Sequence, residues 1–327
     1  MESISRYITT TFRFLSQDQR VALAKSTLPD DPLRMYNCLM ETRQIEKQLY
    51  EPDGQNLWVR DGVIYEGRPV VHIGSNTKAP NYKLSNFYNT PVVLNYSSVK
   101  ASKQFEAIAR LFPNLEEWLG PQGQQLFPSS EHAYQALKAA DKNTFMAFTV
   151  EGFLGKWPNT ASHPFEKALE TAPVNSTARK SHEKLAATKF DMWKKKNMIG
   201  ILAKMATNPR TAGMLGLCFR HPRGTVSPDE WKSVEKSLWL DLVLPSKYSK
   251  QFNPSLYTLL RDTGNAYILE YGRSARMDAL SPRKTSPYWN GAITPEPQDP
   301  DDWHGSMRFV LHGKNTMGCY LLELRDR

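Results

Sequence analysis

Cysteine is scarce in this chain of 327 residues, which contains only Cys38, Cys218 and Cys319. The three lie far apart and form no Cys-x-x-Cys pair, which argues against a thiolate zinc site and for a reducing compartment without structural disulfides. The seven histidines include no His-x-x-x-His pair, so we expect no catalytic zinc either. The sequence therefore predicts an activity that needs no metal and no other cofactor.

Long apolar runs are also absent. No stretch of about 18 apolar residues occurs, so we expect no membrane span. The N-terminal residues Met1-Glu-Ser-Ile-Ser-Arg6 lack the basic region and apolar stretch of a secretion signal. With 40% hydrophobic and 11% aromatic residues, the chain can bury a substantial core, in one elaborated domain or two. These features predict a cytoplasmic protein.

Acidic residues are fewer than basic ones, 33 against 42, which gives a formal net charge of +9. Much of the excess lies between Arg179 and Lys204, where eight basic and two acidic residues give a local charge of +6. Phe190 and Trp193 lie in the same window, and their rings can stack on bases. The window favours contact with nucleic acid, and a solvated helix face is the alternative. The contacts are assigned to Trp193, Lys194, Lys195 and Lys196.

One segment places three reactive side chains on a single helical face. A helix is expected to begin at Ser129 or Ser130, either of which can cap it, and to continue to Ala140 because Gly, Pro and β-branched residues are absent. At about 100° per residue, Glu131, Gln135 and Lys138 fall within roughly 60° of one another. An acid, an amide and an amine arranged in this way can bind and cleave a polar bond. The alternative is an ordinary first-turn glutamate and a solvated lysine.

The same segment, Ser130-Glu-His-Ala-Tyr-Gln-Ala-Leu-Lys138, resembles the Ser-Glu-His-x-x-Gln-x-x-Lys helix of the NADAR family, also called YbiA-like. Four further segments resemble family motifs and occur in the family's order. They are Leu84-Ser-Asn-Phe-Tyr88, Ile201 to Gly216, Asp229 to Gly264 with Trp231 and Asn253-Pro-Ser-Leu, and Gly313-Lys-Asn-Thr-Met-Gly318 continuing to Arg325. Five segments in register make the resemblance specific over roughly residues 83 to 327.

The resemblance implies an α+β fold, predominantly helical, with a small sheet in a NADAR core and large insertions. The catalytic domain is expected at residues 81–327, with insertions near 97–123 and 141–197. Residues 1–80 are expected to form an N-terminal extension.

The residue patterns predict individual elements as well. In chain order they are short helices within residues 17–50, a hairpin over residues 58–73 that turns at Glu66-Gly-Arg68, a strand at Pro91–Asn95, a helix at Lys103–Phe112, helical structure over Trp231–Leu260 interrupted at Pro245 and Pro254, a loop over residues 273–312, and a helix at Met317–Leu324. The family resemblance implies a further strand at Leu84–Tyr88.

The resemblance also implies cleavage of an N-glycosidic bond between ribose and a nitrogen base. Glu131 would act as general acid or electrostatic partner, and Lys138 would attack the anomeric carbon and form an imine. Attack needs a neutral amine, which burial favours and an ionised Glu131 opposes. The positions carried over as substrate-binding are Asn86, Phe87, His132, Gln135, Trp231, Trp289, Gly313, Asn315 and Gly318. For Trp231, core packing is the alternative, and Arg325 is expected in a salt bridge.

Two positions depart from the family pattern. Ser286 stands where the family has an acidic residue, and Asp278 or Asp302 could fill that place from an altered loop. The family's Leu-Gly-Arg turn reads Leu215-Gly-Leu217, so its arginine is absent or replaced by Arg220.

The substrate that the resemblance implies is ADP-ribosylated guanine in DNA, with ADP-ribose as the product, in reversal of a toxin's modification or in phage counter-defence. One rival is a metabolic N-glycosidase acting on ribosylamino-pyrimidine phosphates of the riboflavin pathway. The other is a non-catalytic module that binds ADP-ribosylated DNA. The basic window favours the polymeric substrate.

Overall fold

In the computed structural model, the chain divides into two units. Unit 1 comprises Met1–Lys83 and Asp262–Leu322, and unit 2 comprises Leu84–Arg261 and Glu323–Arg327. The structure describes residues 59–74, 77, 80–156, 179–180, 197–221, 224–271, 287–295 and 309–327. Helices and small sheets make up these residues, which confirms an α+β protein at the coarse level. This division groups residues 262–322 with the N-terminal part, and the catalytic domain expected at 81–327 stays a prediction.

Unit 1 contains the expected hairpin. Strands β1 (Val59–Tyr65) and β2 (Arg68–Ile73) pair antiparallel, and β5 (Tyr267–Glu270) lies parallel to β2 at the other side. The turn residues Glu66 and Gly67 have φ angles of 50° and 71°. Two successive positive φ angles match the twist of a tight hairpin, and glycine adopts them without strain. The helices expected within residues 17–50 lie outside the described residues.

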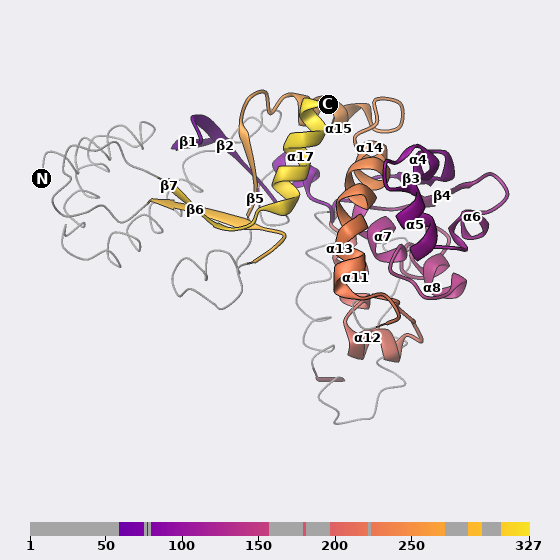
Figure 1. The fold of residues 1–327 in the computed structure, drawn as a ribbon. Coiled ribbons are helices and arrows are strands. Elements are labelled where there is room, and N and C mark those ends of the chain that lie inside the picture. Colours follow the sequence, from indigo (N-terminus) through magenta and orange to yellow (C-terminus); the bar gives the residue numbers. More distant parts are fainter. Residues whose placement is uncertain are drawn as a thin grey trace, which may run out of the picture. The chain divides into compact units, whose positions relative to one another are not determined.

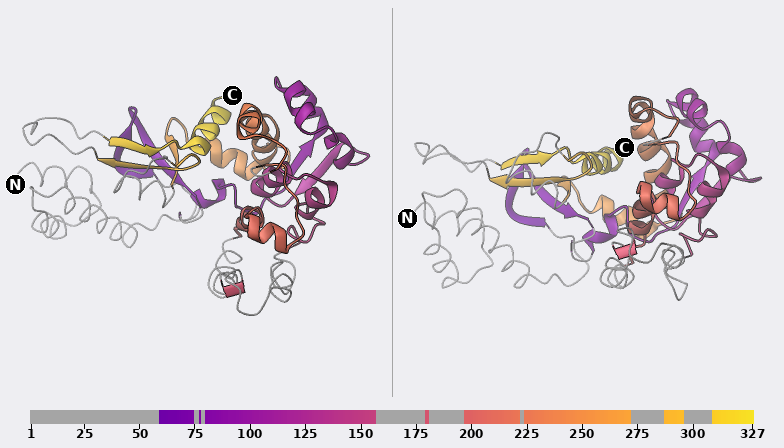
Figure 2. Two further views of the ribbon diagram at one scale, coloured as in Figure 1. Left: turned by 60° about the horizontal axis from the view of Figure 1, so that its bottom comes forward. Right: turned by 90° about the horizontal axis from the view of Figure 1, so that it is seen from below.

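A second pair of strands in unit 1 corrects the prediction of a loop over residues 273–312. Strands β6 (Gly291–Pro295) and β7 (Phe309–Gly313) pair antiparallel over five positions and run side by side in Figure 2. The Pro, Ser and Asp residues around them conceal the short strand pattern in the sequence. The last helix, α17 (Thr316–Asp326), agrees with the expected one.

A long helical segment forms one side of unit 2. It runs without a break through α13 (Pro228–Ser237), the π-helical turn η2 (Leu238–Val243) and α14 (Leu244–Lys247), as Figure 1 shows. Pro245 has no N–H to donate to the preceding turn, and the backbone N–H of Leu244 donates to Trp239, five residues back. Pro245 therefore changes the hydrogen bonding of the helix without ending it. The interruption expected at Pro254 is present, since residues 248–253 are not helical and α15 (Pro254–Arg261) begins there.

Helix α7 (Ser130–Ala136) also belongs to unit 2, together with a pair of strands and several short helices. They are β3 (Val92–Asn95), which pairs antiparallel with β4 (Gln124–Phe127), and the helices α4 (Tyr96–Ala101), α5 (Phe105–Leu111), α6 (Leu115–Trp118), α8 (Lys142–Ala147), α11 (Gly200–Ala206) and α12 (Pro209–Met214). Strand β3 and helix α5 confirm the elements expected near these positions.

The strand expected at Leu84–Tyr88 is wrong. A 3₁₀ turn, η1 (Asn81–Leu84), leads into a series of turns instead. The ammonium of Lys247, which is completely buried, donates to the carbonyls of Leu84 and Ser85 at 3.1 and 2.6 Å, and Tyr248 Oη donates to Leu84 at 2.8 Å. Carbonyls that accept from side chains in this way are withdrawn from a strand ladder.

All seven residues of α7 are buried. The helix packs against α11, η2, α8, β3 and β4. Gly200 permits the close contact with α11, because a Cβ at that position would lie 2.7 Å from both the Phe87 Cα and the Ser129 Oγ. The helix is shorter than predicted: it ends at Ala136, and residues 137 and 138 form a turn before Ala139 bridges to Phe219. Tertiary pairing, which local helix propensity does not report, ends it.

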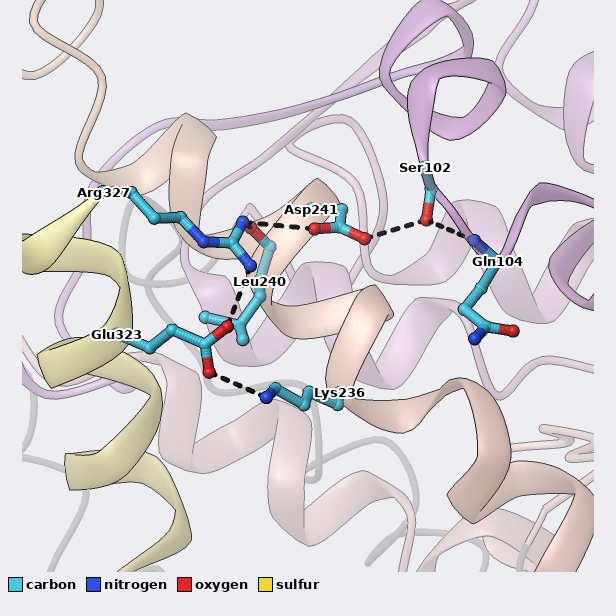
Figure 3. Close-up of polar contacts among 7 residues, drawn as sticks. All are labelled: Ser102, Gln104, Lys236, Leu240, Asp241, Glu323 and Arg327. Carbon is cyan, nitrogen blue, oxygen red and sulfur yellow. Dashed lines mark hydrogen bonds and ion pairs between the residues drawn. The ribbon is translucent and has the colours of Figure 1, made fainter.

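The C-terminal residues of unit 2 are held by a chain of polar contacts, drawn in Figure 3. The Arg327 guanidinium donates to Asp241 at 3.2 Å and to Glu323 at 3.1 Å, and Glu323 also pairs with Lys236 at 2.8 Å. Asp241 accepts from the Ser102 hydroxyl at 2.8 Å. Isolated exposed ion pairs contribute only about 0–1 kcal/mol each to the free energy of unfolding. We therefore assign this network a positional role, which is to fix the last turn of α17, and not a large share of the stability.

Candidate active site

The start of α7 is fixed by Ser129 and His132. Ser129 has an extended backbone, and its hydroxyl oxygen accepts from the His132 N–H, which confirms the expected cap. The same hydroxyl lies 2.8 Å from His132 Nδ1, and Nε2 lies 3.4 Å from the Leu154 carbonyl. Burial lowers the pKa of His132 to about 3, so the imidazole is neutral at pH 7. Both ring nitrogens contact protein atoms, so His132 holds the first turn of α7 against Ser129 and Leu154.

Glu131 and Gln135 form the expected pair on one face of α7. Gln135 Nε2 donates to Glu131 Oε1 at 2.7 Å, and the two residues are 4% and 7% exposed respectively. The Glu131 backbone N–H donates to the Asn86 carbonyl, so Asn86 lies beside the acid. The solvated alternative for Glu131 therefore does not apply, because this carboxylate is buried and hydrogen-bonded.

Two buried acceptors beside Glu131 have no hydrogen-bond partner among the residues that the structure describes. They are Asn86 Oδ1 and Gln135 Oε1. A buried acceptor without a hydrogen bond costs free energy, and such atoms are uncommon in folded proteins. A ligand that presents hydroxyl or N–H donors would satisfy both atoms.

Lys138 lies on the turn that follows α7, where its carbonyl accepts from the Arg220 N–H. Its ammonium lies 4.3 Å from the ring centroid of Tyr134 and 5.7 Å from that of Trp231. Burial lowers the pKa of Lys138 to about 8, against the opposing effect of the Glu131 and Glu235 carboxylates, and Lys204 lowers the pKa further. The competition between burial and Glu131, which the sequence left open, is thus decided by burial.

Phe87 and Trp231 contribute aromatic surface to the site. Phe87 is partly buried, its carbonyl accepts from the Gly200 N–H, and the Lys204 ammonium lies 5.3 Å from its ring centroid. Trp231 is 2% exposed, stacks on His221 at 4.7 Å and meets the edge of Phe112 at 6.0 Å. Trp231 is thus packed in the core, which is the alternative weighed for it, and its ring also lies 5.7 Å from the Lys138 ammonium.

Sequence reasoning missed Glu235 and His221. Glu235 is 7% exposed and accepts hydrogen bonds from Tyr134 and Trp231. The pKa of His221 is lowered to about 4 by burial and by Lys138, and its Nδ1 has no hydrogen-bond partner within the described part of the chain. The spacing of Trp231 and Glu235, four residues apart on a helix, could have indicated a shared face. Nothing in the sequence indicates His221.

The remaining carried-over positions, Trp289, Gly313, Asn315 and Gly318, belong to unit 1 and are grouped apart from those on α7. Asn315 is completely buried: its Nδ2 donates to the Ile268 carbonyl and to Tyr267 Oη, and its Oδ1 accepts from the Glu270 N–H. Gly313 has a φ of 78°. A Cβ on Gly318 would lie 2.3 Å from the Ile268 carbonyl oxygen. Asn315 and Gly318 thus join α17 to β5.

Arg220 is buried and does not present its guanidinium for a ligand. It donates to the carbonyls of Ala139 and Leu111 and lies over the rings of Phe112 and Trp118. Arg325 forms the expected ion pair, with Asp326 at 2.9 Å. Trp193, Lys194, Lys195 and Lys196 lie outside the described residues, as do Asp278, Ser286 and Asp302.

Two kinds of feature are absent from the described parts of the chain. No helix there has the length and apolar character needed to cross a membrane. No three His, Cys, Asp or Glu side chains gather in those parts as possible metal ligands.

The comparisons with known proteins add no relative. No protein-family model, curated protein or solved structure matches the chain. The resemblance to the NADAR family therefore rests on the five sequence segments and stays a prediction.

Proposed function

We propose that the protein is an N-glycosidase of the NADAR type that removes ADP-ribose from ADP-ribosylated guanine in DNA. The observation that carries the proposal is the amine of Lys138, held over two aromatic rings beside a buried carboxylate, with a pKa lowered to about 8. At pH 7, about a tenth of such amines are neutral, far more than at the ordinary pKa of about 10.4. This population makes Lys138 a competent nucleophile.

The reaction follows from these groups. The neutral Lys138 amine attacks the anomeric carbon of the ribose, the bond to the base nitrogen breaks, and that nitrogen takes up a proton for which Glu131 is the donor or the electrostatic partner. The Lys138 nitrogen loses a proton, and the ribose ring opens to an imine. Water then adds to the imine, which releases ADP-ribose and restores the free amine. Gln135 holds Glu131 in place, and the Asn86 and Gln135 oxygens are acceptors for ribose hydroxyls or base N–H groups.

The test uses the purified full chain and a single-stranded oligonucleotide with one ADP-ribosylated guanine. Free ADP-ribose and the unmodified oligonucleotide should appear in equal amounts by mass spectrometry. Hydrolysis of ribosylamino-pyrimidine phosphates alone would replace the proposal with the metabolic N-glycosidase. Tight binding of the modified oligonucleotide with no product would replace it with the non-catalytic module.

The basic window is predicted to hold the nucleic acid. Replacing Lys194, Lys195 and Lys196 with alanine should weaken DNA binding and lower the dependence of log K on log salt by roughly two or three, because each phosphate contact contributes roughly 0.7–0.9 through counterion release. The measurement is a salt titration of DNA affinity. Trp193→Ala should cost about 1–3 kcal/mol of binding if the indole stacks on a base.

Free ADP-ribosyl-guanosine is the control substrate for this prediction. It has no phosphodiester chain, so its hydrolysis should be nearly unchanged in the triple variant. Equal loss on both substrates would assign the segment to the active site or to folding. No loss on either would leave the solvated helix face as the explanation.

A further inference from the structure

A carboxylate, a phenol and an indole meet directly beside Lys138. The Tyr134 hydroxyl donates to Glu235 Oε1 at 2.5 Å, and the Trp231 Nε1–H lies 3.2 Å from the same oxygen and 3.1 Å from the Tyr134 Oη. Tyr134 and Trp231 are the two rings against which the Lys138 ammonium lies. One oxygen, Glu235 Oε1, therefore accepts hydrogen bonds from both of the residues whose rings lie against the amine.

The three residues have little freedom to rearrange. Each is 7% exposed or less. Tyr134 is stacked on Trp239 with 4.4 Å between ring centroids, and Trp231 is covered by His221. Tyr134 comes from α7 and Glu235 from α13, 101 residues further along the chain. Burial and the neighbouring Glu235 raise the pKa of Tyr134 well above its ordinary value, so the phenol keeps its proton and remains the donor.

We propose that Glu235 is a positioning residue of the active site. It fixes the Tyr134 and Trp231 rings against which the Lys138 amine lies, and it holds a negative charge beside that amine. The inference deepens the proposed function, because it rests on Lys138 being the nucleophile. It assigns Glu235 no contact with substrate, since its Oε1 is already used by Tyr134 and Trp231.

The charges that face Lys138 come from four parts of unit 2. Glu131 on α7 and Glu235 on α13 raise its pKa, Lys204 on α11 lowers it, and His221 lies near enough for the amine to lower the pKa of the imidazole. Neutralising Glu235 removes one of the two opposing carboxylates while burial persists. The pKa of Lys138 should then fall, and the neutral amine should be populated at lower pH.

The experiment measures the titration of Lys138 directly, without turnover. The full chain is labelled with trace acetic anhydride between pH 6 and 11, and acetylation of the Lys138 peptide is quantified by mass spectrometry. The midpoint should lie near pH 8 in the wild type and about one pH unit lower in Glu235→Gln, whose amide oxygen can still accept from Tyr134 and Trp231. Asp229→Asn, an exposed change on the same helix, should leave the midpoint unchanged.

A second variant separates position from charge. Glu235→Asp keeps the charge but is too short to hold the Tyr134 hydroxyl, so kcat should fall at least tenfold (about the scale of a lost supporting contact) with KM nearly constant. An unshifted midpoint in folded Glu235→Gln would overturn the inference. If Glu235→Gln does not fold, an unchanged kcat in Glu235→Asp would overturn it.

The outcomes also separate this inference from the proposed function. A wild type that releases no ADP-ribose, with the midpoint still shifted in Glu235→Gln, would remove the proposed function and leave the action of Glu235 on Lys138 standing. A wild type that turns over, with the same midpoint in both proteins, would remove the role of Glu235 alone.

Discussion

Lys138→Ala should release no measurable ADP-ribose from the modified oligonucleotide, because the variant lacks the amine that attacks the anomeric carbon. Borohydride added during turnover should trap a covalent adduct on the wild type, and peptide mapping should place the adduct at Lys138. The rate should rise with pH through about pH 8, since only the neutral amine attacks and burial lowers the pKa of Lys138 to about that value.

The matched control for Lys138 is Lys142→Ala on the neighbouring helix α8. Lys142 is exposed and pairs only with Glu117, at 3.1 Å, among the ion pairs of the described residues. This variant should keep wild-type turnover and trapping. An adduct at Lys314, or full activity without Lys138, would reject the assignment of the nucleophile.

Glu131→Gln should lose at least about a hundredfold in kcat, the usual scale for a group that donates a proton or stabilises charge in the transition state. Gln135 can still donate to the new amide oxygen, so the helix should keep its geometry. The pKa of Lys138 should fall at the same time, because Glu131 is the largest effect that raises it. The pH–rate profile should therefore move to lower pH while its maximum drops.

Glu117→Gln is the control for this second variant, since Glu117 is an exposed acid and its loss should leave the rate unchanged. A fall of less than tenfold in Glu131→Gln, in a protein of normal thermal stability, would show that Glu131 is neither the acid nor the charge partner. A large fall in kcat with an unmoved pH–rate profile would instead show that Glu131 acts in the reaction without influencing the pKa of Lys138.

Local signals in the sequence predicted several elements correctly. Ser129 caps α7, Glu66 and Gly67 form the hairpin turn, and the helical structure is interrupted at Pro254. Each of these features depends on the φ preference or the hydrogen bonding of one or two neighbouring residues, so no distant part of the chain is needed to establish it.

The errors arise where distant residues decide the local structure. Leu84–Tyr88 is a turn because Lys247 and Tyr248 bind the carbonyls at its start. The helix of Glu131 ends at Ala136, before the expected Ala140, because the following residues pair with Phe219 and Cys218. No pattern within either segment reports these partners.

The candidate site likewise has features that follow from local sequence and features that depend on distant residues. The sequence alone determined that Glu131 and Gln135 share one face of α7, because helical geometry relates positions that are close in the chain. It also predicted Lys138 on that helix, whereas the helix ends at Ala136 and Lys138 lies on the turn that follows. Tertiary structure alone decided the charge state of Lys138 and the placement of Glu235 beside it, because desolvation and Coulomb interactions depend on which distant residues surround the amine.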